Sequence, residues 1–415
     1  MTVIIAGAGI AGLSLGLSLH SQGIPFHIFE SVEELRPLGV GINLQPHAVR
    51  EIFEMGLEEE IDQIGLKTEE VAYFNAYGSL IWAEPRGRFA GYNWPQYSIH
   101  RGRLQMMLHD AVVARAGAAC ITMGAALERW EQTDNGVTAH FVNRRTGASA
   151  GAHDGAVLVA ADGINSAARA ALYPSEGPAH WRGTMMWRGV TRAPAFRTGR
   201  TMGMAGTWDV KFVCYPIAEH ADGTVDLNWI ADIAKPADYP WLKQDWNREG
   251  RISDVLPPFE GWDFDWLNVP DIIRNAQAIY EYPMVDRNPL DAWTHGRMTL
   301  MGDAAHAMYP IGSNGASQAI LDARVLARCL RDHGVTQAGL DAYDAERRVA
   351  VNAVVLANRG DGPDKVLDVV AGRAPDGFNR IEDVMSAVEL ADMAAGYKKT
   401  AGMDIDALNA RPAIL

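Results

Sequence analysis

Residues 3–12 read VIIAGAGIAG and join a short apolar, partly β-branched run to three glycines in G-x-G-x-x-G spacing. The apolar run is typical of a buried parallel strand, and the residues behind the glycines predict a helix to about Ser21. Gly7 permits a tight turn, Gly9 lets the backbone approach a pyrophosphate, and Gly12 lets the helix pack closely on the strand. The helix N-terminus then faces the negative charge of the phosphates.

A second strand is predicted at residues 25–29 and ends at Glu30, 18 residues after Gly12. An acidic side chain at this distance accepts hydrogen bonds from the ribose hydroxyls of a bound dinucleotide. Strand, glycines, helix, second strand and acid therefore occur in the order of a dinucleotide-binding βαβ unit. The alternative is a plain βαβ unit that binds no ligand.

The bulk composition is ordinary for a soluble globular protein. With 415 residues the chain exceeds one ordinary core, so we expect two closely packed domains. A net charge of −14 argues against nucleic acid or an anionic membrane as the main partner. The three cysteines are far apart and form no C-x-x-C pair, which favours buried thiols in a reducing cytoplasm and no metal site. No basic leader or membrane-spanning run is evident, so we expect a cytoplasmic protein.

Two further buried strands are predicted to end in short glycine–aspartate turns. Residues 156–161 are apolar and stop at Asp162-Gly163, and residues 298–301 stop at Gly302-Asp303. Ligands of open α/β sheets gather at the carboxyl ends of strands, so both turns are site candidates. For Asp162 the alternative is an acid that caps the helix behind it.

The middle of the chain differs in character. From 183 to 283 short predicted strands, rich in Trp, Tyr and Met, indicate an inserted, mainly antiparallel sheet and the wall of a substrate site. Residues 144–154 are expected to be a polar turn, and residues beyond 359 a loose polar helix with a tail.

Together the three turns resemble the class A FAD-dependent aromatic monooxygenases, the para-hydroxybenzoate hydroxylase superfamily, over about residues 3 to 360. The motifs are GAGIAG at 7–12, ADGINS at 161–166 and GDAAH at 302–306. The resemblance implies an α/β fold, with a Rossmann-like FAD-binding domain of the glutathione-reductase type, the inserted antiparallel sheet and C-terminal helices.

Several phrases are similar to the methylphenazine-carboxylate monooxygenase subfamily of phenazine biosynthesis. They are RPLGVGIN at 36–43, EPRG at 84–87, PQYSIHRG at 95–102, MWRGVT at 186–191, YPMVDR at 282–287 and NGASQAILD at 314–322. On this basis we expect a discontinuous FAD-binding domain at 1–73, 98–182 and 284–358, a substrate domain at 74–97 and 183–283, and a C-terminal helical tail at 359–415.

The resemblance implies FAD as the cofactor and NAD(P)H as the co-substrate. The residues implied at the cofactor are Gly7, Gly9, Gly12, Glu30, Gly41, Arg101, Gln105, Leu127, Asp162, Gly163, Arg169, Gly302, Asp303, Pro310, Gly312, Gly315 and Ala316. Glu30 would meet the adenosine ribose, Leu127 the adenine through its backbone, Arg101 a flavin phosphate and Asp303 the ribityl chain.

The other implied roles lie closer to the flavin ring. Asp162-Gly163 resembles a motif that contacts both FAD and NAD(P)H, and Arg169 accompanies it. Residues 310–316 would bring backbone and a helix N-terminus to the isoalloxazine, where the helix dipole favours electron density on the reduced ring. Many relatives have Gly-Gln where this chain has Ser313-Asn314, so only the backbone role carries over there. Gly41 would let the main chain lie against a flat ligand, or simply kink a strand.

Strand alternation places Lys211, Val213 and Tyr215 on one face of the predicted strand 211–216. We expect Lys211 to meet a substrate carboxylate or phenolate, with Tyr215 as a hydrogen-bond partner. The alternative is a solvent-facing lysine and a packed tyrosine.

Ring hydroxylation with O2 needs a cofactor that accepts electrons one at a time, because no side chain does so. The resemblance implies hydroxylation of an aromatic or N-heteroaromatic acid or phenol through a flavin hydroperoxide, with or without decarboxylation, by a monomer or homodimer. Two alternatives remain: an NAD-dependent dehydrogenase, which leaves the second and third motifs unexplained, and a non-catalytic FAD-fold binding protein, which the intact flavin motifs disfavour.

Overall fold

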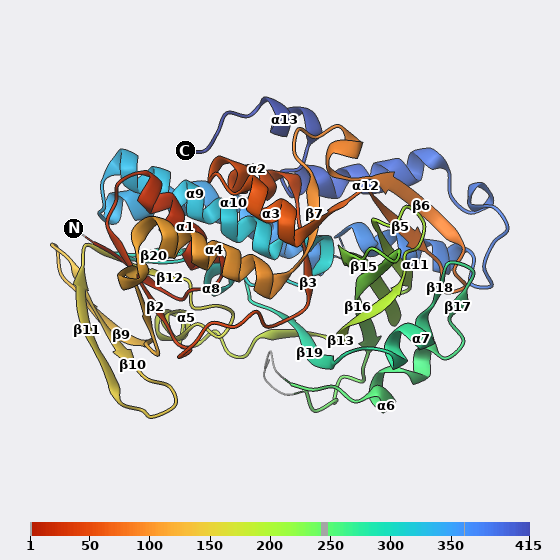
Figure 1. Ribbon diagram of the computed structural model, residues 1–415, viewed down its shortest axis with the longest axis horizontal. Helices are drawn as coiled ribbons and strands as arrows, with labels where there is room; N and C mark the ends of the chain where they lie inside the picture. The colour runs from red at the N-terminus through yellow and green to blue at the C-terminus, as the bar shows by residue number, and fades with distance from the viewer. Residues whose placement is uncertain (1, 242–247, 361) are drawn as a thin grey trace.

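A mostly parallel six-stranded sheet, with strands from the N-terminal 160 residues and from residues 294–300, organises one half of the computed structural model, which describes residues 2–241, 248–360 and 362–415 (Figure 1). Its strand order is β20-β21-β12-β1-β2-β8, and only β20 runs antiparallel. The strands are β1 (Val3–Ala6), β2 (Phe26–Glu30), β8 (Ile121–Met123), β12 (Val157–Ala160), β20 (Thr294–His295) and β21 (Met298–Leu300). The short apolar runs predicted as buried strands are confirmed, since β1, β12 and β21 are fully buried.

The register of this sheet explains why distant motifs meet. Ala6 of β1 pairs with Ala160 of β12, which pairs with Leu300 of β21. All three strands are parallel, so the turns that follow them leave the sheet at the same edge.

Long helices cover this sheet. α1 packs against α9 and α4, and α10 packs against α9. The helices of this part are α1 (Ile10–Ser21), α2 (Pro46–Glu54), α3 (Glu58–Ile64), α4 (Arg101–Ala116), α5 (Ala167–Leu172), α8 (Asp303–His306), α9 (Gly315–His333) and α10 (Gln337–Arg359). Among helices of the described residues, none has the length and apolarity needed to cross a bilayer.

A seven-stranded sheet forms the other half of the molecule, to the right in Figure 1, where β15 and β16 are green. Its order is β19-β13-β16-β15-β14-β5-β6, antiparallel except for the β14–β5 pair, as the sequence predicts. The strands are β5 (Glu70–Phe74), β6 (Leu80–Pro85), β13 (His180–Pro194), β14 (Thr201–Gly206), β15 (Val210–Glu219), β16 (Thr224–Ala234) and β19 (Ile279–Asp286). Trp187 and Trp229 pack in the core on one side of this sheet, while the other side carries the polar residues discussed below.

Three smaller sheets complete the fold, one of them the antiparallel pair β17 (Asp263–Phe264) and β18 (Leu267–Asn268). β3 (Gly41–Leu44) and β4 (Gly65–Thr68) flank β7 (Gln96–His100). β9 (Ala126–Gln132), β10 (Val137–Val142) and β11 (Ser149–Gly155) form an antiparallel ribbon. The prediction of a polar turn at 144–154 is wrong for its second half, because β11 pairs with β10 along its length. Its sequence, SAGAHDG, has no β-branched or aromatic residue, so local propensity could not reveal an exposed edge strand.

The chain after Arg359 is more ordered than the loose helix predicted. It forms α11 (Lys365–Arg373), α12 (Ala387–Thr400) and α13 (Ile405–Ala410). Val366, Leu367 and Val370 of α11 are buried against β5, β14 and β15 residues. This C-terminal segment therefore belongs to the packed structure and reaches the seven-stranded sheet.

Candidate active site

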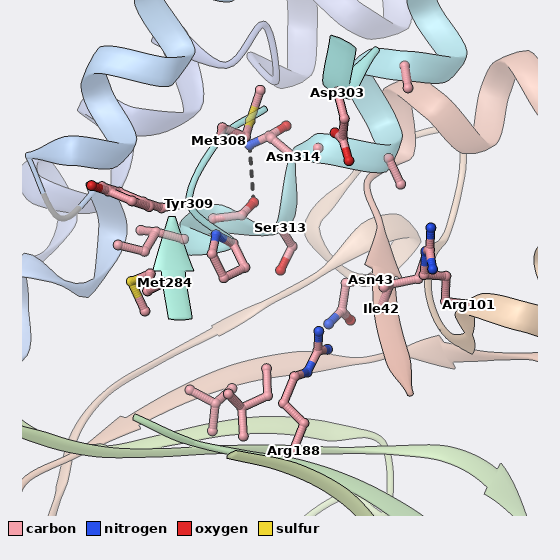
Figure 2. A pocket seen from close by; sticks show the side chains of 18 of the residues that line it. Ile42, Asn43, Arg101, Arg188, Met284, Asp303, Met308, Tyr309, Ser313 and Asn314 are labelled. Atoms are coloured by element: carbon pink, nitrogen blue, oxygen red, sulfur yellow. Dashed lines mark hydrogen bonds between the residues drawn. The ribbon is translucent and has the colours of Figure 1, made fainter. Parts of the chain in front are cut away.

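One cavity of about 270 Å³ lies between the two large sheets, and all three motifs open onto it. Gly9 comes from the first motif, Gly163 from the second and Asp303 from the third; Figure 2 shows Asp303. Side chains of the seven-stranded sheet line its other half; they are Arg188, Met202, Met204, Lys211, Val213, Tyr215, Ile230, Asp232 and Met284. An extended ligand that touches all three turns would therefore present its far end to this sheet.

The glycine turn after β1 fits a pyrophosphate. A Cβ on Gly12 would overlap the carbonyl oxygen of Gly7, and Gly7 itself has φ of +111°, so both positions need glycine. A Cβ on Gly9 would meet nothing within 4 Å, because Gly9 faces the cavity. The N-terminus of α1 has no side-chain cap, so its first N–H groups remain for an anion. This donor set fits the FAD that the sequence implies.

Glu30 and Gln105 brace that turn from outside the cavity. The Glu30 carboxylate accepts a hydrogen bond from the Ala8 N–H at 2.7 Å, and Gln105 Nε2 donates to the Ala8 carbonyl at 2.9 Å. Both side chains thus fix the peptide between the first two glycines. The ribose contact expected of Glu30 stays a prediction.

Arg101 and Asp303 belong to the part of the cavity near the glycine turn, on α4 and α8 respectively (Figure 2). Burial lowers the pKa of the Arg101 guanidinium, and the charge of Asp303 opposes that shift. The two charges stabilise each other in a partly desolvated space, where a phosphate and hydroxyls of the cofactor would also find partners.

Asp162 acts within its own turn. Its Oδ2 accepts hydrogen bonds from the N–H groups of Ala167 and Ala168, at 2.8 and 3.4 Å, so it caps α5 as the alternative reading proposed. Its Oδ1 is buried and has no hydrogen-bond partner, and burial raises the pKa of this carboxyl. The neighbouring Gly163 is the residue of this motif that lines the cavity together with Ala161.

Arg169 and Leu127 lie outside the cavity lining, and their expected contacts with the cofactor stay predictions. The Arg169 side chain donates to Glu176 and to the carbonyls of Ala304, Ala305 and Asn288. These contacts occupy all five of its N–H donors, so Arg169 ties the third motif to the second. Leu127 is buried in β9 against the core of the parallel sheet.

We expect Arg169→Met to lower the free energy of unfolding by about 3–5 kcal/mol, because Glu176 would lose its buried partner. Urea unfolding of the apoprotein measures this. Arg192→Met, which breaks the exposed ion pair with Asp222, serves as the control and should cost less than about 1 kcal/mol. Weaker FAD binding with unchanged stability would contradict the assigned role.

Gly41 is held by the seven-stranded sheet. Its N–H donates to Asn228 Oδ1 at 2.7 Å, and its carbonyl accepts from the Tyr215 hydroxyl at 2.8 Å and from Arg188 at 2.6 Å. A Cβ on Gly41 would collide with Asn228 and Tyr215, so the close approach requires glycine. The Tyr215 proton is thus engaged by backbone, and burial raises the pKa of Tyr215 to about 12.

Lys211 faces the cavity with Val213 and Tyr215, as strand alternation predicts, but its charge is already matched. Its Nζ lies 2.6 Å from Asp364 and 3.3 Å from Asp232. Lys211 is only 8% exposed, so the solvent-facing alternative is wrong. The expectation that Lys211 meets a substrate anion needs correction, because two carboxylates surround a single ammonium.

The turn at Ser313-Asn314 is fixed by the C-terminal segment. Ser313 has φ of +55°, a left-handed conformation that is costly for a residue with a Cβ. Asn314 Nδ2 donates to the Gly312 carbonyl and to the Tyr397 hydroxyl at 2.8 Å, and that hydroxyl donates to Asn358 (Figure 2 shows the turn). A tyrosine 83 residues away thereby holds the backbone that would lie beside the flavin ring.

We expect Tyr397→Phe to lower the free energy of unfolding by about 1–2 kcal/mol, because Asn314 and Asn358 lose a buried partner. The turn would relax, so the visible absorption spectrum of bound flavin should shift. Tyr77→Phe is the matched control, since the Tyr77 hydroxyl bonds to an exposed backbone carbonyl. An unchanged spectrum in Tyr397→Phe would show that the hydroxyl does not set the turn.

His306 is held in a buried network. Its Nε2 lies 2.6 Å from Asp322, and both side chains are fully buried. Asp322 also accepts from Arg347 and from the Gly302 N–H, so this network anchors α8 to α9 and α10.

Several cavity residues escaped the sequence reading. Ile230 and Asp232 line the cavity from one face of β16, and Asn228 on the same face binds Gly41; the same period-two argument used for Lys211 would have found them. Arg188 lies within the MWRGVT motif at 186–191, but the sequence alone gave no reason to place it at the cavity. Asp364 gave no signal, because it enters the cavity from the segment read as a tail.

The comparisons with known proteins agree with this geometry. A family model described as an FAD binding domain matches residues 1–202 and 276–358. The chain belongs to the FAD binding domain family. This family member is 45% identical over 361 residues to the phenazine 1,6-dicarboxylic acid hydroxylase PhzS of Lysobacter antibioticus, covering 86% of this chain and 89% of the relative. It is 30% identical to the 3-amino-4-hydroxybenzoate 2-monooxygenase PtnB3 of Streptomyces platensis, covering 79% of each.

Among solved structures, a substrate complex of salicylate hydroxylase matches with a TM-score of 0.74 at 23% identity, covering 100% of this chain and 99% of that one. This likeness confirms the fold. The flavoprotein is an FAD-dependent aromatic hydroxylase, with the NAD(P)H co-substrate typical of the class. The family, fold class, cofactor and reaction type predicted from the sequence are thus confirmed.

Proposed function

We propose that this flavoprotein hydroxylates an N-heteroaromatic acid of the phenazine type, using NAD(P)H and O2. The observation that carries the proposal is the cavity in which three cofactor motifs face a wall of the seven-stranded sheet that combines apolar side chains with charged ones. The similarity to a relative named for a phenazine dicarboxylic acid supports the ring system.

FAD would extend from the glycine turn at Gly9, past Arg101 and Asp303, to the backbone at 310–316. The uncapped N-terminus of α1 would bind the pyrophosphate, and Asp303 would accept hydrogen bonds from ribityl hydroxyls. Bound FAD supplies the chemistry that side chains lack, namely acceptance of electrons from NAD(P)H and activation of O2.

The chain's own residues place the ring and exclude water. Met202, Met204, Ile230 and Met284 offer an apolar wall that would hold an aromatic ring against the flavin. Arg188 reaches up from β13 towards Asn43 and would bind the acid group of the substrate (Figure 2). Excluding water from this part of the cavity would favour transfer of oxygen to the aromatic ring over side reactions with water.

The test is a screen of aromatic acids for faster NAD(P)H oxidation by the purified holoenzyme, with product identification by mass spectrometry. A substrate should gain one oxygen, with water and NAD(P)⁺ as the other products. If the attacked carbon bears the carboxyl group, hydroxyl replaces it and CO2 is released. Failure of every phenazine and pyridine acid to stimulate oxidation would refute the proposed substrate class.

A further inference from the structure

Three charged side chains lie together on the wall of the cavity that the seven-stranded sheet forms; this wall is called the chamber floor and the three residues the triplet. Lys211 of β15 and Asp232 of β16 are directly opposed across the strand pair, and Asp364 comes from the turn Gly362–Asp364 after α10. The ammonium lies 3.3 Å from Asp232 and 2.6 Å from Asp364. All three residues line the cavity and are at least nine-tenths buried.

With both carboxyls ionised, the triplet has one more negative than positive charge; burial, with the charge of Asp364, raises the pKa of Asp232, while Lys211 opposes that shift. Burial alone disfavours the charged amine, but Asp364 and Asp232 outweigh it and raise the pKa of Lys211, so the ammonium stays charged. Each carboxylate uses one oxygen on Lys211, while Asp232 Oδ1 and Asp364 Oδ1 are buried without a hydrogen-bond partner. These two acceptors are therefore available for a donor that the protein itself does not supply.

A positively charged side chain, Arg188, lies near the triplet on the same chamber floor. Arg188 pairs with Ile230 across β13 and β16, two residues from Asp232, which corresponds to about 7 Å along a strand. Arg188 donates to the Gly41 carbonyl, and its Nε is buried without a partner. The chamber floor is therefore bipolar, with a cation at one end and an anionic triplet at the other.

We propose that Asp232 and Asp364, held by Lys211, determine specificity by accepting hydrogen bonds from an N–H, an O–H or a cationic nitrogen of the substrate. The acid group of the same substrate lies at Arg188, so the enzyme selects a ring with an anion at one end and a donor at the other. This inference rests on the proposed function, and it adds that a second carboxylate at the triplet end is disfavoured.

A purely structural role for the triplet is the main alternative. Such a triplet would join the C-terminal segment to the sheet, and its loss would cost stability without changing ligand preference. Unpartnered buried carboxylate oxygens also occur outside the cavity, at Asp162 and Glu51. What favours recognition is that both members of this pair belong to residues that line the cavity, where a ligand could approach them.

The test uses the holoenzyme and three probes that share one ring: phenazine-1-carboxylate, 6-aminophenazine-1-carboxylate and phenazine-1,6-dicarboxylate. Dissociation constants come from anaerobic titrations that follow flavin absorbance, supported by rates of NAD(P)H oxidation. For the unsubstituted enzyme we expect 6-aminophenazine-1-carboxylate to bind most tightly of the three probes. The dicarboxylate should bind at least about tenfold more weakly than phenazine-1-carboxylate.

Asp232→Asn and Asp364→Asn each remove one negative charge and should improve dicarboxylate binding at least about fivefold relative to the monocarboxylate. Lys211→Met should weaken dicarboxylate binding further. Asp226→Asn, on the same strand but outside the cavity, is the control and should leave the order unchanged. Thermal melting and flavin content show whether each variant is folded.

Unchanged ligand preference in folded Asp232→Asn and Asp364→Asn, or equal binding of all three probes by the unsubstituted enzyme, would overturn the inference. Lower stability with the same preference would establish the structural alternative. If no aromatic acid binds or stimulates NAD(P)H oxidation, the proposed function itself fails, which is a different result from stimulation without discrimination.

Discussion

Gly9→Ala should abolish tight FAD binding and leave the apoprotein as stable as before. The added Cβ meets no protein atom within 4 Å, so the fold has room for it. It points instead into the cavity, where the cofactor pyrophosphate would need to approach the backbone. We expect FAD affinity to fall by about 100-fold or more, equivalent to about 2.8 kcal/mol.

Gly12→Ala provides the matched contrast. Here the Cβ would overlap the carbonyl oxygen of Gly7 within the turn itself, so the fold must distort. We expect a loss of about 3 kcal/mol or more in the free energy of unfolding of the apoprotein. Thermal melting of both apoproteins, with FAD titrations, separates the two effects. A yellow, active Gly9→Ala enzyme, or a melting temperature that falls as far as that of Gly12→Ala, would contradict the assignment of Gly9 to the cofactor.

Asp303→Ala should yield a folded but nearly colourless protein. Asp303 lines the cavity at the start of α8, opposite Arg101, so its removal takes a hydrogen-bond acceptor from the ribityl chain and a counter-charge from Arg101. Because both the charge-assisted hydrogen bond to the cofactor and the counter-charge of Arg101 would be lost, we expect about 100-fold weaker FAD binding.

The measurement is the FAD content of the purified protein and a titration of the apoprotein, followed by flavin fluorescence. Asp271→Ala, which removes an exposed first-turn acid from α7 (Val269–Arg274), controls for general effects of losing a carboxylate at a helix start. Full yellow colour and turnover in Asp303→Ala would remove Asp303 from the flavin site.

The dinucleotide-binding unit could be predicted because its signals are local. Residues 3–30 carry the strand periodicity, the glycine spacing and the terminal acid within one short stretch. The convergence of the second and third motifs followed from a general rule, since neighbouring parallel strands release their ligand-binding turns at one edge. The register that pairs Ala6, Ala160 and Leu300 confirms that expectation.

The roles of individual charged residues could not be predicted in the same way. Arg169 resembles a cofactor residue in sequence, yet carbonyls more than 100 residues away occupy its donors. Lys211 faces the cavity as predicted, but Asp364 reaches it across 153 residues of chain. A local pattern fixes the side on which a side chain lies; it does not fix which charges from elsewhere surround it.

The sequence by itself therefore determined the fold class, the family, the cofactor and the cavity face of β15, because each depends on short-range periodicity or on contiguous motifs. Only the tertiary structure decided that the segment after Arg359 reaches the cavity through Asp364 and holds the turn at Ser313-Asn314 through Tyr397, and that two carboxylates surround Lys211. The physical reason is that electrostatic interaction depends on distance in space, and the partners that neutralise Lys211 become its neighbours only when the whole chain has folded.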